Sequence, residues 1–310
     1  MTTTTNILVG IVTFNRIDKL ICTLGECRAM GFDQLVVVDN GSTDGTRDFL
    51  ESLPDITTIL SERNEGGSGG FHRVMRYFFE QTSMDFVLLM DDDAYPTFSR
   101  DRLVGFLADH CALECVAYAC KVVYPSGSLC EMNRPGKNVL AYHPFFQLTK
   151  DWHIDESFQE TIVDWASFVG LLLAREAIKR VGVVSAQFFI YSDDVYYTLS
   201  ISRNKGRILY CPQLTLVHDC KRSSRNLAHH TPLRLEKELV NKIVLIREFS
   251  SFPRLYIFFY IARQIWKNPR KSLSILRAAR KGVFADLALY RNQPVQSDSI
   301  PFVASSFTRI

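Results

Sequence analysis

The first part of the chain alternates between short runs that are apolar throughout and longer stretches in which apolar residues recur with a helical period. The short runs have the length and the β-branched content of buried strands, and they occupy 7–13, 34–39, 56–60 and 86–90. The helical stretches between them, bounded by turn residues, occupy 19–30, 46–53 and 71–81. Strands that are apolar on both faces belong to a parallel sheet with helices on each side. The pattern therefore predicts an α/β fold with a mostly parallel central sheet.

In the second part of the chain, residues 122–164 show no regular spacing of apolar residues, and a regular hydrophobic pattern returns after them. Its later elements are an apolar run, a helix, an aromatic segment and a strand, predicted at 165–174, 174–182, 188–201 and 208–218. Past Lys221 the pattern becomes helical and basic. We therefore expect a main unit over 1–220 and a helical region over 221–310.

The basic charge is concentrated in the last quarter of the chain. The formal net charge of the 310 residues is +3, yet 221–291 hold 16 Lys and Arg against 4 Asp and Glu, a balance of +12. A hydrophobic content of 47% with 22% charged residues is that of an ordinary globular protein with a real core. The clustered charge predicts an anionic partner, which we expect to be a membrane surface rather than nucleic acid.

Two segments of this region indicate how it would meet a membrane. Residues 252–266 are apolar, but they are too short to span a bilayer and Arg263 interrupts them. After Pro269, apolar and basic positions alternate as in a helix that lies in a membrane interface. The apolar positions are Leu273, Leu276, Val283, Phe284 and Leu287, and the basic ones are Arg270, Lys271, Arg277, Arg280 and Lys281. The alternative is an oligomer contact or a helical cap on the core.

The N-terminal residues and the cysteines predict a cytoplasmic protein. No positively charged segment precedes the first apolar run and no small-residue cleavage site follows it, so we interpret this start as the lead into a strand. The eight cysteines lie scattered on apolar segments without a C-x-x-C pair. That arrangement argues against a zinc site and a secreted disulfide framework, and we expect most of the thiols to be reduced in the core.

Polar residues follow the predicted strands at their carboxyl ends, where open parallel sheets bind ligands. They lie at 13–15, 39–40, 63–64 and 91–93. We expect these four loops to converge on one crevice. Within it, Asp39 could accept a hydrogen bond from a nucleobase imide or a ribose hydroxyl, although a capped turn explains the same residue equally well.

The sequence DDD at 91–93 directly follows a buried strand and predicts a cation site. Like charges this close cannot all stay ionised unless a cation balances them. Asp91 and Asp93, as alternate residues of an extended segment, would face the same side. Mg²⁺ binds one or two carboxylates and completes its shell with phosphate oxygens and water, so we expect a substrate with a diphosphate. An acidic surface turn is the alternative.

Three further features could carry chemistry. Asp193 and Asp194 precede a helical stretch, where carboxylates cap a helix, but one of them could also remove a proton from an attacking hydroxyl. His218 ends the last predicted strand and could complete the metal shell, although a lone histidine is more often structural. Trp165 is more often a core residue, but with Asp164 it could contact a sugar.

The sequence NEGGSGGFHR at 64–73 places four glycines in five positions, which are Gly66, Gly67, Gly69 and Gly70. It follows the third strand and lacks the Lys and the Ser or Thr of a P-loop. We interpret it as a loop whose missing side chains let a donor lie against the backbone. A helix starting at Phe71 would then aim its N-terminus at the ligand.

Together these motifs resemble the inverting family-2 glycosyltransferases, which have the GT-A nucleotide-sugar fold. The segments that carry the resemblance are VTFNR at 12–16, VVVDNGSTDGT at 36–46, RNEGG at 63–67 and LMDDDAYP at 89–96. The glycine-rich stretch followed by DDD is most similar to the galactofuranosyltransferases. The resemblance implies that 1–220 is a GT-A catalytic domain, with a nucleotide-binding half over about 1–95 and an acceptor half over about 96–220.

The resemblance also implies roles for individual residues. Asp91, Asp93 and His218 would be ligands of Mn²⁺ or Mg²⁺, and Asp194 would be the catalytic base. The UDP would lie against residues at the strand ends, which are Thr13, Asn15, Arg16, Asp39, Arg63, Asn64 and Asp92. The donor sugar and the acceptor would lie against the four glycines, Asp164, Trp165 and Asp193.

The implied function is the transfer of galactofuranose from UDP-galactofuranose, with inversion, to a glycan hydroxyl in cell-surface polysaccharide synthesis. An acceptor linked to a polyprenyl diphosphate, at the inner face of the plasma membrane, would reconcile such an enzyme with a membrane-binding region. That region could also form a homo-oligomer. Rhamnosyltransferases that use dTDP-rhamnose share much of this frame, and a non-catalytic carbohydrate-binding protein is the alternative from another class. The sequence departs from the family pattern at Val74, where a glycine often follows Arg73.

Overall fold

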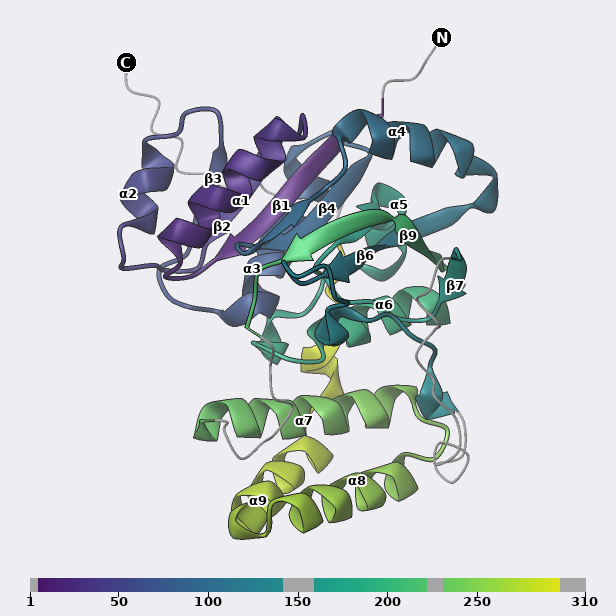
Figure 1. The fold of residues 1–310 in the computed structure, drawn as a ribbon. Coiled ribbons are helices and arrows are strands. Elements are labelled where there is room, and N and C mark those ends of the chain that lie inside the picture. The colour runs from purple at the N-terminus through teal and green to yellow at the C-terminus, as the bar shows by residue number, and fades with distance from the viewer. Residues whose placement is uncertain (1–4, 142–158, 222–230, 296–310) are drawn as a thin grey trace.

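The computed structural model describes residues 5–141, 159–221 and 231–295. A sheet with its covering helices forms one end of the molecule, and three C-terminal helices form a layer at the other end (Figure 1). The fold is α/β, as the pattern of apolar runs predicts. Parts of the predicted irregular stretch and of the predicted C-terminal region, 142–158, 222–230 and 296–310, lie outside the described residues.

The first half of the sheet is parallel, and its strands match the predicted apolar runs. In spatial order they are β3 (Thr57–Leu60), β2 (Leu35–Asp39), β1 (Ile7–Thr13) and β4 (Phe86–Asp91). β1 and β2 are buried along their whole length, which is why their sequences show no polar alternation. Thr13 pairs with Asp39 and Val12 pairs with Asp91, so three strands end side by side.

The second half of the sheet is mixed. Its strands are β5 (Ala94–Pro96), β6 (Cys115–Val123), β7 (Thr161–Val163), β8 (Leu171–Ala174) and β9 (Arg207–His218). β6 and β9 pair in parallel, β8 lies antiparallel between β4 and β6, and β5 and β7 pair antiparallel with β9. Only the end of the predicted apolar run at 165–174 is a strand, because Gly170 turns the chain with a φ of +80°. The sequence reading did not identify β5, β6 or β7.

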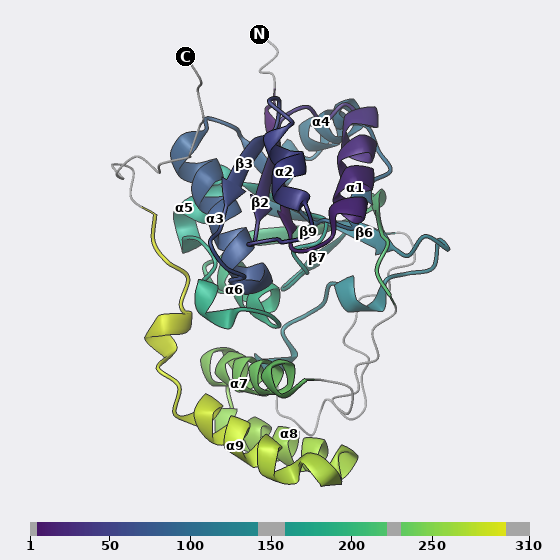
Figure 2. The ribbon, with the colours of Figure 1, turned by 90° about the vertical axis from the view of Figure 1, so that its left-hand side faces the viewer.

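Helices cover both faces of the sheet (Figure 2). The side chains of β1 alternate between them, since Val9 and Ile11 pack in the core under one face and Leu8 and Val12 in the core under the other. The first core includes α1 (Ile17–Ala29) and α4 (Arg100–Asp109), and the second includes α3 (Gly66–Gln81), α5 (Arg175–Val181) and α6 (Asp193–Arg203). The short α2 (Thr46–Glu51) lies between β2 and β3 in the chain.

The C-terminal layer consists of α7 (Pro232–Phe249), α8 (Pro253–Lys267) and α9 (Ser272–Val283). α7 packs against α6, and Leu199 of α6 and Leu239 of α7 belong to the same apolar cluster. α8 and α9 pack on α7, away from the sheet (Figures 1 and 2). Short 3-10 turns join the larger elements, at η1 (Cys111–Leu113), η2 (Glu131–Asn133), η3 (Val139–Ala141), η5 (Ala186–Phe188), η7 (Pro269–Lys271) and η8 (Leu287–Tyr290). No helix among the described residues is long and apolar enough to cross a membrane.

The glycine stretch is the first turn and a half of α3, so the prediction of a loop over these residues is wrong. The absence of side chains at these positions leaves room for neighbouring parts of the same protein. A Cβ at Gly66 would lie 1.9 Å from the carbonyl oxygen of Phe189, and a Cβ at Gly70 would lie 2.3 Å from Cγ1 of Val12 in β1. Only Gly67, of the four, would meet nothing within 4 Å. The glycines therefore let α3 pack tightly on β1 and on the segment before α6.

This packing predicts opposite effects for alanine at two neighbouring glycines. Gly70→Ala should destabilise the protein by about 1–3 kcal/mol, because Val12 is a stiff β-branched side chain in a buried strand and has little room to shift. Gly67→Ala should be neutral or stabilising by up to about 1 kcal/mol, because alanine favours the helix. Urea unfolding followed by circular dichroism measures both, and equal stability of the two variants would contradict the packing argument.

Candidate active site

Three strand ends and the loops that follow them meet at one edge of the sheet, as the sequence predicts. The hydroxyl of Thr13, at the end of β1, donates to Oδ2 of Asp92 at 2.8 Å. Asn40, after β2, donates through Nδ2 to Oδ1 of Asn64 at 3.3 Å and to the carbonyl oxygen of Gly66 at 2.8 Å. The four predicted loops therefore form one connected surface.

Asp91, Asp93 and His218 come together at this edge. β5 pairs Ala94 with His218, which brings the end of β9 beside the end of β4. Nε2 of His218 lies 3.1 Å from Oδ1 of Asp93 and 4.0 Å from Oδ2 of Asp91. One ligand atom from each residue lies within 4.8 Å of the other two. Two carboxylates and one imidazole are a donor set that suits Mn²⁺ or Mg²⁺, so the residues fit such an ion.

The charges of this group are strongly coupled. Burial raises the pKa of Asp91 to about 7, even though 41% of its side chain is exposed at the surface of the site. Burial also opposes the charge on Asp93, but the hydrogen bond from His218 and the nearby positive charges outweigh it and lower its pKa. Burial disfavours the imidazolium of His218, yet the hydrogen bond to Asp93 and the contributions of Cys130, Cys220 and Asp91 together outweigh it and raise its pKa to about 12. A proton on His218 thus supplies positive charge at the position where a metal would be bound.

Asp92, the middle carboxylate, points back toward β1. Besides Thr13, it accepts from the backbone N–H of Phe14 at 3.4 Å and pairs with Nη1 of Arg16 at 3.2 Å. The same Arg16 nitrogen lies 2.6 Å from Oδ2 of Asp93. Asp92 is buried, and its contacts fix the shape of the loop after β1. Arg16 is about half exposed and balances two of the three aspartates.

Asp39 is a buried carboxylate with one oxygen that accepts no hydrogen bond from the described residues. Its Oδ1 accepts the backbone N–H of Ser42 at 3.0 Å, which is the turn cap that the sequence allows. Its Oδ2 has no hydrogen-bond partner among the described residues, and the nearest cation is Nε of Arg47 at 3.6 Å. A buried oxygen without a donor is costly. The geometry leaves room for both interpretations of Asp39, because one oxygen caps the turn while the other can accept from a ligand.

The remaining residues predicted to face the nucleotide lie around this point. Asn15 adopts a left-handed conformation with a φ of 52°, and its Oδ1 accepts the backbone N–H of Thr43 at 2.7 Å. That bond ties the loop after β1 to the loop after β2. Asn64 accepts the backbone N–H of Gly66 at 2.8 Å and so begins α3. Arg63 is exposed beside it.

Asp193 and Asp194 stand at the N-terminus of α6, where the charge of Asp91 acts on Asp193. The backbone before them is strained, since Phe189, Tyr191 and Ser192 all have a positive φ between 64° and 69°. Asn241 of α7 holds this segment. Its Nδ2 donates to the carbonyl oxygens of residues 188, 190 and 191 at 2.8–3.0 Å. Sequence analysis missed Asn241, because it is an ordinary polar residue within a region predicted only to be helical and basic.

The two carboxyls of this pair differ in pKa. Burial, followed by the charge of Asp194, raises the pKa of Asp193 well above its usual value. Burial also raises the pKa of Asp194, to about 6, while hydrogen bonds from the Val195 backbone N–H and the Ser167 hydroxyl favour its ionised form. The neutral form is therefore favoured more strongly at Asp193 than at Asp194. Environments that push two pKa values apart are typical of acid and base roles.

Asp164 and Trp165 lie in the segment between β7 and β8. The indole Nε1 of Trp165 donates to the carbonyl oxygen of Lys137 at 3.1 Å, and Oδ2 of Asp164 accepts the backbone N–H of Asn138 at 2.8 Å. A Cβ at Gly136 would lie 2.8 Å from the Trp165 ring. Both residues therefore hold the 136–138 segment in place, whatever else they contact.

The cysteines are free, and five of the eight are buried, as predicted. The spacing of the cysteines along the sequence argued against a zinc site. The fold weakens that argument, because it brings two cysteines close to a histidine. Cys130 and Cys220 lie on the Nδ1 side of His218, and the three residues form a second group whose ligand atoms lie within 4.8 Å of one another. Nδ1 of His218 bonds Oδ1 of Asn133 at 2.8 Å and lies farther, 3.9 Å, from the Cys130 sulfur.

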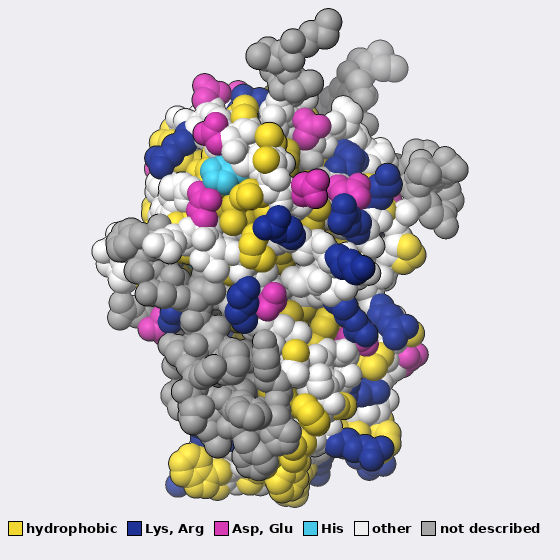
Figure 3. Space-filling view, turned by 90° about the vertical axis from the view of Figure 1, so that its right-hand side faces the viewer, with side chains coloured by type: hydrophobic (Ala, Val, Ile, Leu, Met, Phe, Trp, Pro, Cys, Tyr) yellow, Lys and Arg dark blue, Asp and Glu magenta, His cyan; other side chains and the backbone are white. Residues whose placement is uncertain are grey.

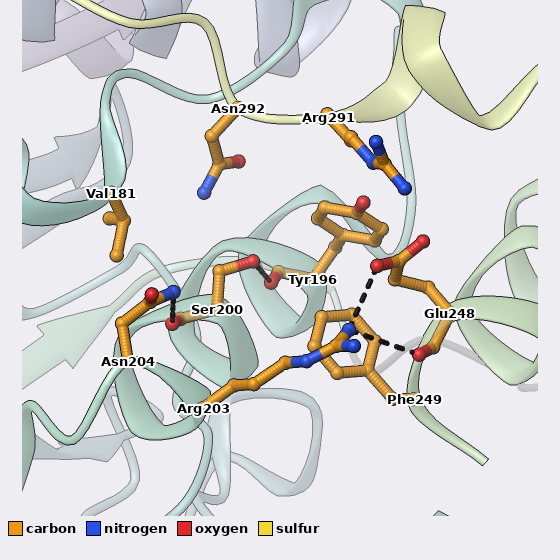
Figure 4. Close-up of a pocket in the computed structure, with 9 residues that line it drawn as sticks. All are labelled: Val181, Tyr196, Ser200, Arg203, Asn204, Glu248, Phe249, Arg291 and Asn292. Atoms are coloured by element: carbon orange, nitrogen blue, oxygen red, sulfur yellow. Dashed lines mark hydrogen bonds and ion pairs between the residues drawn. The ribbon is translucent and has the colours of Figure 1, made fainter.

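A separate pocket lies behind α6 (Figure 4). It is lined by Tyr196, Ser200 and Arg203 of α6 together with Glu248 and Phe249 of α7 and the 291–292 segment. Within it Arg203 pairs with Glu248 at 2.8 Å. It contains none of the residues predicted for the site, so the candidate active site is the open edge of the sheet.

The comparisons with known proteins agree with the fold and with the geometry of the candidate site. The model of the glycosyl transferase family 2 matches residues 8–159. The galactofuranosyltransferase GlfT1 of Mycolicibacterium smegmatis is 26% identical over 228 residues, which are 71% of this chain and 73% of that protein. GlfT2 of the same organism is 36% identical over 101 residues, but these are 28% of this chain and only 15% of the relative.

Solved structures show the same fold. The crystal structure of GalNAc-T7 with UDP, GalNAc and Mn²⁺ superposes on 94% of this chain and 56% of that one, with a TM-score of 0.59 and 11% identity. At that identity the likeness concerns the fold alone, and it confirms the GT-A architecture predicted from the sequence. This chain therefore contains a glycosyl transferase family 2 domain on a GT-A fold, and it is a glycosyltransferase.

Proposed function

We propose that this enzyme transfers galactofuranose from UDP-galactofuranose to a glycan hydroxyl with inversion of configuration. The observation that carries the proposal is that two groups are close enough for the charge of Asp91 to act on Asp193: the cluster of Asp91, Asp93 and His218, and the pair Asp193 and Asp194 at the start of α6. The first group suits a metal-bound diphosphate and the second suits a base. The galactofuranosyl donor is supported by the relatives GlfT1 and GlfT2, whose names state that activity.

The mechanism follows from these positions. Asp194 removes the proton from the acceptor hydroxyl, whose oxygen attacks the anomeric carbon from the face opposite the diphosphate. The bond from that carbon to the diphosphate oxygen breaks, and the configuration inverts without a covalent intermediate. Asp91, Asp93 and His218 would hold a divalent ion, Mn²⁺ or Mg²⁺, that supplies positive charge to the leaving diphosphate. Arg16 pairs with the adjacent carboxylates of Asp92 and Asp93 and favours their ionised forms.

The nucleotide would lie along the strand ends. Asp39 offers its Oδ2 to the base, and Arg63 and the loop of Asn15 would flank the UDP. Thr13, Asp92 and Asn64 would shape this surface through their own hydrogen bonds. Of the glycines, Gly67 faces open space and is the one that we propose lies against the donor sugar. Asp193 and the segment of Asp164 and Trp165 would face the acceptor.

The face of α8 and α9 that points away from α7 is the part that we propose contacts a membrane. Its most exposed apolar side chains are Phe258 (64%), Trp266 (80%), Leu273 (71%) and Phe284 (78%). Arg263, Lys267, Arg277 and Arg280 lie on the same two helices. Figure 3 shows hydrophobic and basic side chains together at this lower end of the molecule. An anionic bilayer surface matches both properties, and it would bring a polyprenyl-diphosphate-linked acceptor to the enzyme.

The donor and the metal are tested together by one panel. UDP-galactofuranose, UDP-galactopyranose and dTDP-rhamnose are supplied with a lipid-linked acceptor, with and without a chelator, and release of the nucleotide is measured. We expect turnover with UDP-galactofuranose only, lost on chelation and restored by Mn²⁺ or Mg²⁺. Turnover with dTDP-rhamnose would assign the rival activity, full activity in chelator would remove the metal role, and binding without turnover would indicate a carbohydrate-binding protein.

The pKa of Asp194 predicts the acid limb of the rate profile. The base must be ionised, so kcat/KM should fall about tenfold for each pH unit below about 6. Asp194→Asn should lower kcat by about 10²–10⁴-fold and remove this limb, whereas Asp193→Asn, which leaves the proposed base in place, should lose less. Steady-state rates from pH 5 to pH 8 give both results. A wild-type limb retained in Asp194→Asn would reject the base assignment.

The membrane proposal predicts that two kinds of change weaken binding to vesicles. The double variants Trp266→Ser with Phe284→Ser and Arg277→Glu with Arg280→Glu should each weaken it by at least about tenfold, since each basic residue contributes about 1 kcal/mol. Ile21→Ser on α1 and Lys179→Glu on α5 are matched exposed controls. Sedimentation with anionic and with zwitterionic vesicles measures the effect, and a change of oligomeric state with unchanged vesicle binding would favour an oligomer contact instead.

A further inference from the structure

A chain of buried hydrogen bonds connects the metal-ligand group with the proposed base. Nδ1 of His218 bonds Oδ1 of Asn133 at 2.8 Å. Nδ2 of Asn133 bonds Oγ of Ser167 at 2.8 Å. The hydroxyl of Ser167 in turn hydrogen bonds the carboxyl of Asp194. This series of hydrogen bonds connects β9, η2, the turn before β8 and the start of α6, which are far apart in the sequence.

The direction of each bond follows from the donors available. Ser167 accepts from the backbone N–H of Val169 at 3.3 Å and from the Asn133 amide N–H, so its single hydrogen is left for Asp194. Because the Asn133 nitrogen faces Ser167, its oxygen faces His218 and must accept. His218 therefore carries a hydrogen on Nδ1, and its Nε2 is the nitrogen directed at Asp91 and Asp93.

The inner members of the chain have no access to solvent that could replace these bonds. His218, Asn133 and Ser167 are all buried. The Cys130 thiol also donates to Oδ1 of Asn133 at 3.0 Å, which fixes the amide from a second side. A fully satisfied buried network holds its members in one arrangement.

We infer that Asn133 and Ser167 are positioning residues that hold the metal-ligating nitrogen of His218 and the carboxylate of Asp194 in one fixed relation. This inference rests on the proposed function for the roles of His218 and Asp194, and it adds two residues that touch neither metal nor substrate. The outer partner of a ligating histidine sets its tautomer and orientation, and its loss lowers metal affinity by about 10–100-fold. Ser167 acts on the metal only through Asn133, so its effect on affinity is smaller and depends on Asn133.

The test measures Mn²⁺ binding to the full-length protein by electron paramagnetic resonance of the free ion, without donor or acceptor. Asn133→Leu should raise the Mn²⁺ Kd by about 10–100-fold, and Ser167→Ala by about 3–10-fold. Ser167→Thr, which keeps the hydroxyl, should restore the Kd to within about twofold of wild type. Asn133→Leu with Ser167→Ala should bind no more weakly than Asn133→Leu alone, because the two residues act in series. Ser185→Ala removes a buried hydroxyl that donates elsewhere, to Leu289, and is the matched control.

Steady-state rates add a readout for the other end of the chain. At saturating Mn²⁺, Ser167→Ala should lower kcat by about tenfold with little change in the KM of the donor, because the bond that it removes is made to Asp194. Ser167→Thr should recover that loss. Asn133→Leu should regain more of its activity than Ser167→Ala when Mn²⁺ is raised.

The outcomes separate this inference from the proposed function. If wild type and Asp93→Asn bind Mn²⁺ equally, the metal site of the proposed function fails. If Asp93→Asn loses binding while Asn133→Leu and Ser167→Ala bind like wild type, the positioning inference is overturned. Additive losses in the double variant would also overturn it. Should Asn133→Leu fail to fold, the comparison of Ser167→Ala with Ser167→Thr decides the question alone.

Discussion

The crowding of carboxylates at the end of β4 is the constraint on which the site depends. Asp91, Asp92 and Asp93 follow a buried strand, where three adjacent negative charges are unstable without positive charge nearby. The fold supplies that charge from two directions, with Arg16 from the loop after β1 and His218 from the end of β9. Arg16 pairs with Asp92 and Asp93, and His218 lies near Asp93 and Asp91, so the three aspartates differ in their sets of partners. That difference leaves Asp91 open to the site and turns Asp92 inward.

The second constraint is the sharp turn before α6. Three non-glycine residues in left-handed conformations would relax if nothing held them. Asn241 holds their carbonyl oxygens from α7, and Gly66 lets the Phe189 carbonyl approach α3 without a clash. Helix α3 and helix α7 therefore together hold Asp193 and Asp194 in position. The C-terminal helices are for this reason part of the structure that shapes the site.

The correct predictions share a physical basis, which is that strand ends are local features. An apolar run followed by polar residues marks a carboxyl end, and the carboxyl ends of parallel neighbours must meet at one edge, so the convergence of Thr13, Asp39 and Asp91 followed from the pattern. The glycines were misread because a sequence shows which side chains are missing but not what fills the space. In the structure Val12 and Phe189 fill it.

The sequence by itself determined the α/β class, the parallel first half and the residue types able to bind a metal and accept a proton, because these depend on local pattern and on chemistry. Only the tertiary structure decided how these residues lie relative to one another and which residues hold them there. Asn133, Ser167 and Asn241 are ordinary polar residues in the sequence, and they become parts of the site because strands and helices distant along the chain pack together. The reason is that hydrogen-bond partners are set by distances in space, which no spacing along the chain specifies.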